Sequence, residues 1–219
     1  MGSGAVFEVV SLREQVERTL SARIVSGEFA PGSVLTVPTL AGEFGVSATP
    51  VREAMLNLAR RGFLTPIRNR GFQVTEVSPD ELAALGEVRV LLEAPPMRWL
   101  AGALSDAVVT RLRALADRIV AAAEKGRFED YLEADTAFHL TLLDETGNEH
   151  LVRLVRELRQ QTRLVGLVSL AESDALVATA LEHGELITLL KAGKGEQAEQ
   201  LMRRHISHVT GLWSGRSEH

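Results

Sequence analysis

Apolar residues recur at helical intervals along most of the chain, and the first such segment lies near its N-terminal end. Its apolar residues are four positions apart, which places them on one face of a helix. They are Leu12, Val16, Leu20 and Ile24. Ser11 and Glu14 have the spacing of a capping box, in which the serine caps the helix and the glutamate reaches back. We therefore predict a helix that begins after Ser11 and ends near Gly27.

Two shorter helices with a tight turn between them are predicted next. Leu40 and Phe44 give the first of them an apolar face, and Gly45 suits its end because glycine readily adopts the left-handed conformation. We expect Val46 to be buried in the turn and Ser47 to cap the second helix. The second helix has an apolar stripe that we expect to be buried. It consists of Val51, Ala54, Met55 and Leu58.

Polar side chains lie on the opposite side of this second helix, near its beginning. They are Ser47, Thr49 and Arg52. A helix, a turn with glycine and a second helix that begins with short polar groups are what a DNA-binding helix-turn-helix requires. A helical hairpin packed in a core is the alternative interpretation.

The period of the pattern then changes, and residues 63–67 and 72–77 suit two short strands. Asn69, Arg70 and Gly71 between them are typical of a hairpin turn. Because this hairpin follows a helix-turn-helix, we interpret it as a wing. Arg70 and Gly71 would then approach the minor groove, where the potential is negative. A plain hairpin turn is the alternative.

The remainder of the chain reads as helical. Ser78 and Glu81 form a second capping box with Pro79 between them, so we place the domain boundary here, between 1–77 and 78–219. The fold class is therefore mainly α, and Pro95-Pro96 should kink the first helix of the second domain. The predicted helices of this domain are 79–102, 105–124, 127–146, 148–170, 174–192 and 196–213.

Four side chains in the second domain suggest a metal site. Asp135 and His139 are four residues apart and share one helix face. His183 and His205 lie on two later helices, at equal distances from the break at 193–195, so an antiparallel hairpin would bring them to the same level. Three neutral imidazoles and one carboxylate suit a divalent cation such as zinc, with nickel or manganese as alternatives. Isolated surface or core histidines are the competing interpretation.

Composition adds limits on the class of protein. The 219 residues include no cysteine, which fits a reducing cytoplasm, and no apolar run reaches the roughly 20 residues of a membrane span. The net charge of −5 divides into about +1 for residues 1–78 and −6 for 79–219. This division is compatible with a DNA-binding first domain joined to an acidic second domain. The binding of the first domain to DNA phosphates should then be modest and salt-sensitive.

The string GVSATPVREAMLNLARRGFL resembles the recognition segment of the GntR family of bacterial winged-helix repressors. In the second half, VRVLLE (88–93), ADTAFHLTLLDETGN (134–148) and EHGELITLLKAGKGEQAEQLMRRHI (182–206) resemble the effector domain of the FadR subfamily, the FCD domain. The two resemblances cover nearly the whole chain. They imply a winged helix-turn-helix followed by an all-α bundle of six or seven helices.

The resemblance also implies particular site residues. FCD domains often bind a metal through one aspartate and three histidines, which fall on Asp135, His139, His183 and His205. An arginine on the first helix of such domains often helps to hold an acidic effector, which suggests Arg89 together with Glu93. An ordinary ion pair between residues four apart on a helix is the alternative for these two.

Some positions depart from the family pattern. Ala48, Pro38 and Asn57 stand where relatives commonly have DNA-facing arginines, so Arg52, Ser47, Thr49 and the wing must contribute more of the binding.

These observations predict a DNA-binding transcriptional regulator of the cytoplasm, a homodimeric repressor on a palindromic operator, controlled by a small carboxylic acid at the metal site. A metal-dependent enzyme that uses the Asp/His cluster is one alternative. A DNA-binding protein whose metal is only structural is another.

Overall fold

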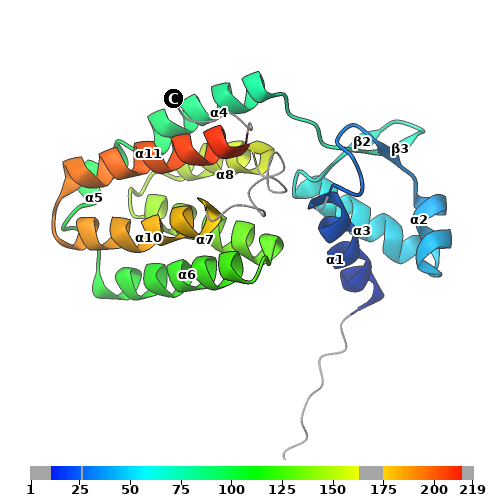
Figure 1. Cartoon of the computed structure of the whole chain (residues 1–219), viewed down its shortest axis with the longest axis horizontal. Helices are drawn as coiled ribbons and strands as arrows, with labels where there is room; N and C mark the ends of the chain where they lie inside the picture. Colours follow the sequence, from blue (N-terminus) through cyan, green and yellow to red (C-terminus); the bar gives the residue numbers. More distant parts are fainter. Residues whose placement is uncertain (1–10, 26, 163–174, 214–219) are drawn as a thin grey trace, which may run out of the picture. The chain divides into compact units, whose positions relative to one another are not determined.

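A computed structural model describes residues 11–25, 27–162 and 175–213 of the chain. The chain forms two compact units, Met1–Thr75 and Glu76–His219 (Figure 1). The first unit combines helices with a small sheet, and the second is helical throughout its described residues. The mainly α fold predicted from the sequence is confirmed, including the order of a winged helix-turn-helix followed by a helical bundle.

The first unit begins with the helix predicted from the spacing of apolar residues. Helix α1 spans Leu12–Val25. Both bonds of its capping box form, because the Glu14 amide donates to Ser11 Oγ at 3.2 Å and the Ser11 amide donates to the Glu14 carboxylate at 3.2 Å. Val16, Leu20 and Ile24 are buried, but Leu12 is 56% exposed and does not belong to the buried face.

The helix-turn-helix consists of α2 (Val37–Phe44) and α3 (Ala48–Arg60). Gly45 ends α2 in the left-handed conformation, with φ 66°, and its amide donates to the carbonyl oxygen of Ala41. The predicted stripe of α3 is buried as a whole, and α3 packs against both α1 and α2. Val46 in the turn is only half-buried, so the expectation of a buried residue there was wrong.

The wing belongs to a three-stranded antiparallel sheet in the order β1-β3-β2. Strands β2 (Leu64–Ile67) and β3 (Gly71–Val74) form the predicted hairpin, and β1 (Val34–Leu35) pairs with the other side of β3. The two-residue strand β1 was not predicted, because so short a segment shows no alternation of its own. Its pairing closes the wing onto the segment that leads into α2.

Gly71 is required by this pairing. It has φ 114°, and a Cβ atom at this position would lie 2.4 Å from the carbonyl oxygen of Leu35. Glycine therefore lets β1 approach β3 at the beginning of the strand. This packing requirement holds whether or not the wing contacts DNA.

The second unit is a bundle of helices. The predicted first helix is divided, because α4 (Pro79–Glu93) ends at the two prolines and α5 (Pro96–Leu100) begins with the second. The helices that follow are α6 (Asp106–Glu124), α7 (Phe128–Asp144), α8 (Glu149–Thr162), α10 (Ala175–Lys191) and α11 (Gly195–Trp213). The predicted ends at 163–170 and 174 lie outside the described residues.

The packing order of the bundle determines which residues meet in its interior. Helices α10 and α11 form an antiparallel hairpin that turns at Gly193, which has φ 71° (Figure 1). Helix α6 packs against α7 and α10, whereas α4 packs against α8 and α11. Among the described residues, no helix is both long enough and apolar enough to cross a membrane.

We expect Gly71→Ala to destabilise the first unit by about 1–3 kcal/mol, because the new Cβ would strain the backbone and collide with β1. Gly42→Ala is a matched control. Gly42 lies within α2, and a Cβ added there would meet no atom within 4 Å beyond the backbone of its own helix. Alanine should therefore leave stability unchanged or raise it by up to about 1 kcal/mol. Urea unfolding followed by circular dichroism measures both effects, and equal stabilities of the two variants would contradict the assigned role of Gly71.

Candidate metal centre and DNA-binding surface

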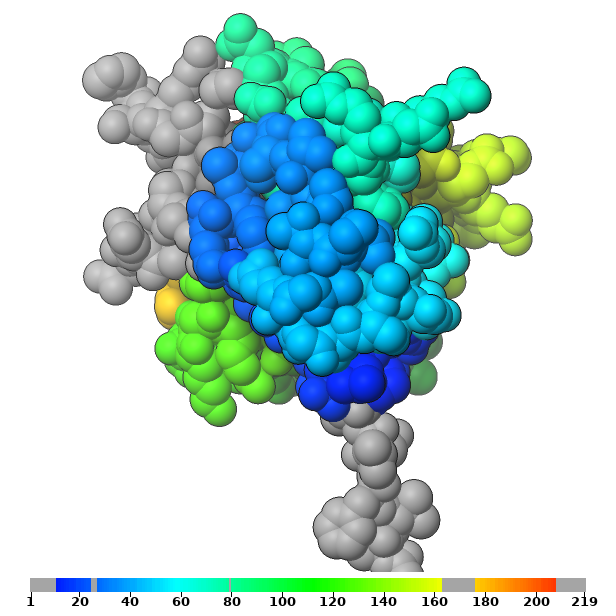
Figure 2. Space-filling model, turned by 90° about the vertical axis from the view of Figure 1, so that its right-hand side faces the viewer, coloured from blue at the N-terminus to red at the C-terminus, as the bar shows by residue number. Residues whose placement is uncertain are grey.

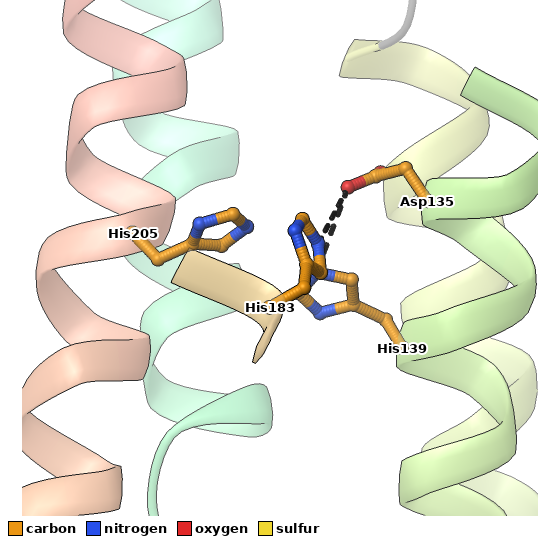
Figure 3. Close-up of side chains that lie close together, drawn as sticks. All are labelled: Asp135, His139, His183 and His205. Carbon is orange, nitrogen blue, oxygen red and sulfur yellow. Dashed lines mark ion pairs between the residues drawn. The ribbon is translucent and has the colours of Figure 1, made fainter. Parts of the chain in front are cut away.

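Three helices of the second unit bring the four predicted ligands together. Helix α7 supplies Asp135 and His139, α10 supplies His183, and α11 supplies His205 (Figure 3). All four side chains are buried, and one nitrogen or oxygen atom of each lies within 4.8 Å of those of the others. The cluster can therefore surround a single ion.

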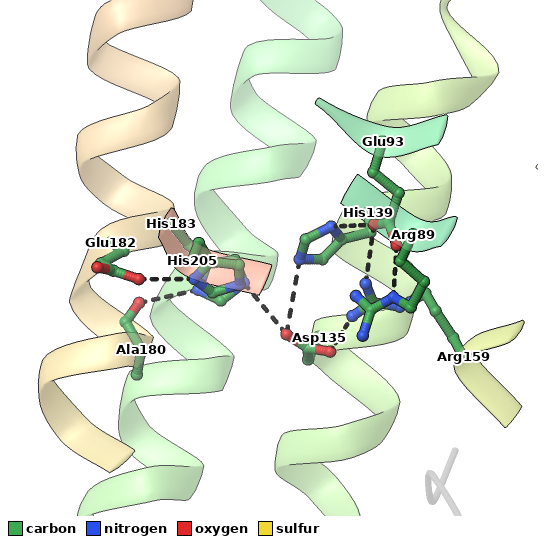
Figure 4. A network of polar contacts seen from close by, with 9 residues as sticks. All are labelled: Arg89, Glu93, Asp135, His139, Arg159, Ala180, Glu182, His183 and His205. Carbon is green, nitrogen blue, oxygen red and sulfur yellow. Dashed lines mark hydrogen bonds and ion pairs between the residues drawn. The ribbon is translucent and has the colours of Figure 1, made fainter. Parts of the chain in front are cut away.

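The outer nitrogen of each imidazole faces an oxygen atom. His183 Nδ1 lies 3.0 Å from the carbonyl oxygen of Ala180, and His205 Nδ1 lies 2.8 Å from the Glu182 carboxylate. His139 Nδ1 lies 2.8 Å from Glu93 (Figure 4). Because the oxygens beside His183 and His205 can accept hydrogen bonds, Nδ1 of these two residues is assigned as the protonated nitrogen and Nε2 retains a lone pair. This is the arrangement by which outer partners orient metal-binding histidines. The His139 Nδ1 contact with Glu93 is not aligned as a hydrogen bond.

The Nε2 nitrogens, which point into the cluster, show whether a cation would fit there. Nε2 of His139 and of His183 are buried, and neither makes a well-aligned hydrogen bond with a described residue. They face Asp135 Oδ1 at 3.8 Å and 3.2 Å respectively. Unpartnered buried nitrogens are costly, and a cation between them and the carboxylate would satisfy all of them. The donor set is therefore suited to a divalent metal.

Charged side chains form a buried network beside this cluster. Arg89 Nε donates to Glu93 at 2.6 Å, and Arg159 Nη1 donates to the other Glu93 oxygen at 2.9 Å. Arg159 also bonds to Asp135 (Figure 4). The two guanidinium groups balance the two carboxylates, so the network is electrically neutral without any ion.

Burial and neighbouring charges set the protonation of the site. Desolvation, followed by the nearby charge of Arg159, lowers the pKa of His139 to about 3. Desolvation also lowers the pKa of His205. Burial tends to raise the pKa of Asp135, but Arg159 and the surrounding imidazoles outweigh it and hold the pKa well below its usual value. His139 and His205 therefore present neutral imidazoles and Asp135 an ionised carboxylate, the forms in which these groups bind metals.

Two members of the site were not predicted from the sequence. Arg159 occupies a position on α8 that the spacing of Val152 and Val155 assigns to the buried face. A charged residue on an apolar face was thus a signal that could have revealed it. Glu182 precedes His183 directly and shows no distinguishing pattern.

The other residues of the second unit that were considered from the sequence differ in their exposure to solvent. Arg89 and Glu93 are 2% and 0% exposed, so they belong to the buried network and not to a surface pair. His150, which was not assigned to the metal, is exposed on α8 beside Arg153. The side chain of His208 and all of His219 lie outside the described residues.

The predicted DNA-binding residues lie on the surface of the first unit. Ser47 precedes α3, and Thr49 and Arg52 lie near its beginning; all three are exposed. Ser47 occupies the N-cap position, but its side chain makes no capping hydrogen bond. Figure 2 looks onto this unit, where residues of α2 and α3 lie on the surface in blue to cyan.

A groove of about 610 Å³ joins the recognition helix to the wing. Arg52 and Arg70 both line it, and neither has an ion-pair partner among the described residues. Pro38 lines the same groove. Arg52 and Arg70 give this groove a positive surface, which can bind DNA phosphates and the edges of bases.

Asn57, one of the departures from the family pattern, faces helix α1 of the same unit. Its amide donates to Glu17 of α1 at 3.0 Å, and Arg61 donates to the same carboxylate at 2.8 Å. Asn57 therefore helps to fasten α3 to α1.

The chain matches two protein families over most of its length. Residues 12–74 match the bacterial regulatory proteins of the gntR family, and residues 84–208 match the FCD domain. The chain belongs to the GntR family. Its FCD domain agrees with the FadR-like subfamily. GntR regulators bind DNA operators, and FCD domains bind small-molecule effectors.

Relatives support the same conclusion. The chain is 33% identical to the HTH-type transcriptional regulator LutR of Bacillus subtilis, over 88% of this chain and 96% of that protein. It is 29% identical to the Nta operon transcriptional regulator of Aminobacter aminovorans, over 83% and 85% respectively. The solved structure of E. coli McbR/YncC is similar, with a TM-score of 0.65, 27% identity and coverage of 91% and 95%. These families and relatives are transcriptional regulators and not enzymes, so the enzyme alternative is set aside.

Proposed function

We propose that this GntR-family regulator binds a small organic acid at a divalent metal in its FCD domain, and that the acid controls its affinity for DNA. Asp135, His139, His183 and His205 would hold the metal, with zinc as the first candidate and nickel or manganese as alternatives, because imidazole nitrogens suit zinc and nickel and the carboxylate suits manganese. The unpartnered inner nitrogens of His139 and His183 are the observation that carries the proposal. When bound, the metal supplies a localised positive charge that attracts an anion.

The charge balance of the site favours an anionic effector. Arg89 and Arg159 already neutralise Glu93 and Asp135, so a divalent cation would leave the buried site with excess positive charge. Glu182 offsets only part of this excess. A small carboxylate would complete the neutralisation, and guanidinium groups bind carboxylates through strong, directional hydrogen bonds. Arg89, with Glu93 as its anchor, and Arg159 are the cations placed to contribute.

A metal with a purely structural role is the second candidate. Four protein ligands in a fully buried cluster are typical of closed structural sites, which favours this alternative. Structural and effector-binding metals differ in one measurable property. Only an effector-binding metal would make acid binding depend on the ion.

The DNA-binding mode follows from the first unit. Ser47, Thr49 and Arg52 would meet base edges in the major groove, and Arg70 with Gly71 would approach the adjacent minor groove. One recognition helix reads only a few base pairs. We therefore propose a homodimeric repressor on a palindromic double-stranded operator, with half-sites roughly 34 Å apart.

Helix α4 offers a connection between the two functions. It begins at Pro79, four residues after the first unit ends, and is capped by the Ser78 hydroxyl, which accepts from the Glu81 amide at 3.1 Å. Its last turns carry Arg89 and Glu93, and Glu93 contacts the metal-site residue His139. An effector that favours one arrangement of α4 would change operator affinity by its differential binding, typically about 1–3 kcal/mol.

The metal prediction concerns stoichiometry and ligand identity. We expect one divalent ion per chain, and His139→Ala, His183→Ala and His205→Ala should each lose most of it. Glu182→Ala should weaken metal binding about 10–100-fold, because Glu182 orients His205. Elemental analysis and competition with a chelator measure both effects. His150→Ala is the control, and a wild-type chain that takes up neither zinc, nickel nor manganese would exclude the site.

The DNA prediction concerns Arg52. We expect Arg52→Ala to weaken operator binding by about 1–3 kcal/mol if the guanidinium contacts guanine. Arg70→Ala should weaken operator and unrelated DNA to a similar degree, because minor-groove attraction depends little on base identity. Fluorescence anisotropy with both DNA molecules measures these losses. Arg111→Ala, an exposed arginine of α6, serves as the control; unchanged affinity in Arg52→Ala would contradict the assignment of the recognition helix.

The effector prediction compares acid binding with and without the metal. We expect di- or hydroxycarboxylic acids to bind the metal-loaded protein in calorimetry, and to bind far more weakly after chelation or in Arg89→Ala. Bound acid should change operator affinity by about 1–3 kcal/mol. If no acid binds, or if chelation leaves binding unaltered, the metal is structural. Circular dichroism of Arg89→Ala distinguishes a loss of acid binding from a loss of the fold.

A further inference from the structure

Helix α7 carries a third buried polar residue on the face that supplies two of the predicted metal ligands. Tyr131, Asp135 and His139 follow one another at intervals of four residues, which places them in one row along the helix. Tyr131 is 2% exposed, so its ring lies in the interior of the bundle. The row thus extends one turn beyond Asp135, on the side away from His139.

The charges that act on Tyr131 place its hydroxyl near the metal centre. Burial, followed by the negative charge of Asp135, raises the pKa of this hydroxyl, and Glu182 raises it further. The positive charge of Arg159 acts in the opposite direction. Charged residues of α7, α8 and α10 therefore surround the same oxygen atom. Because its pKa is raised, the hydroxyl stays protonated at neutral pH and can donate a hydrogen bond.

The hydroxyl of Tyr131 forms no hydrogen bond with any residue that the structure describes. The two carboxylates that act on it have other partners, because Asp135 accepts from Arg159 and Glu182 lies against His205. Buried tyrosines usually find a partner, since an unpaired polar group in an interior is costly. A position in the core accounts for the ring of Tyr131, but phenylalanine would fill it equally well. A ligand that accepts a hydrogen bond would account for the hydroxyl.

The cavity beside the histidines limits where such a ligand can lie. It measures about 10 Å³, which is room for one ion or water molecule. Its apolar lining consists of Leu186, Leu201 and Met202. A carboxylate placed against these side chains would lose its hydration without gaining a partner. The polar end of an acid is better placed beside Asp135, where the guanidinium of Arg159 lies (Figure 4).

We propose that Tyr131 donates a hydrogen bond to the second carboxylate of a short dicarboxylic acid whose first carboxylate binds the metal. This inference rests on the proposed metal-bound effector and adds a binding residue to it. Four residues of an α-helix rise about 6 Å, which sets the distance between the level of Asp135 and that of Tyr131. The carboxylates of succinate are separated by a similar distance, whereas acetate has no second carboxylate.

Tyr131→Phe removes the hydroxyl and keeps the ring. In calorimetry of the zinc-loaded full-length protein, we expect the variant to bind succinate about tenfold or more weakly than the wild type, because a hydrogen bond to a charged group is lost. Acetate binding should be unchanged. Equal succinate affinities of the two proteins, or an equal loss for acetate, would overturn the proposal. A zinc-loaded wild-type protein that binds neither acid would overturn the proposed effector function as well, so the two failures are distinguishable.

Thermal unfolding without acid tests whether the hydroxyl has only a structural role. We expect Tyr131→Phe to unfold at the wild-type temperature or above it, because no described partner loses a bond. Thr162→Val is the control, since the buried Thr162 hydroxyl donates to the carbonyl oxygen of Arg159 at 3.3 Å. This control should unfold at a lower temperature than the wild type. A similar decrease in Tyr131→Phe would assign its hydroxyl to the fold and overturn the proposal.

A spectroscopic test is available because Tyr131 is the only tyrosine of the chain. Incorporation of 3-fluorotyrosine therefore gives the protein a single fluorine resonance. We expect this resonance to shift when succinate is added to the zinc-loaded protein, and to remain unchanged when succinate is added after the metal is removed. A resonance that does not move in zinc-loaded protein saturated with succinate would overturn the proposal.

Discussion

Glu93 is the side chain on which the interior of the second unit depends. Its carboxylate is fully buried on α4 and faces Arg89, Arg159 of α8 and His139 of α7. Removing one partner from such a network leaves an uncompensated buried charge, which typically costs about 3–5 kcal/mol. Because three helices meet at this one group, the position of α4 is tied to an imidazole of the Asp/His cluster.

The arrangement has a consequence for regulation. Helix α4 directly follows the DNA-binding unit in the chain, and its two faces differ. Glu93 on the inner face contacts His139, whereas Leu91 on the outer face is 66% exposed. Under the proposed function, a change in the charge of the site would act first on α4, because Glu93 of this helix contacts His139.

Local sequence signals predicted much of the fold because they depend on neighbouring residues. The capping boxes at Ser11 and Ser78, the left-handed Gly45 and the buried stripe of α3 all act within one or two turns of chain. Strand β1 was missed because a two-residue strand is defined only by its partner β3. The exposure of Leu12 was missed for a related reason. Periodicity identifies the apolar face of a helix, but it does not show how far along that face other elements pack against it.

In the candidate site, too, some features follow from the local sequence and others only from tertiary packing. The sequence by itself determined which residue types were available, since Asp135 and His139 share a helix face and His183 and His205 are symmetric about a break. Only the tertiary structure decided that these groups meet, and that Arg159 and Glu182 join them. Helical spacing fixes relationships over a few residues. Charges that are distant in sequence act on one another only after packing removes the water between them.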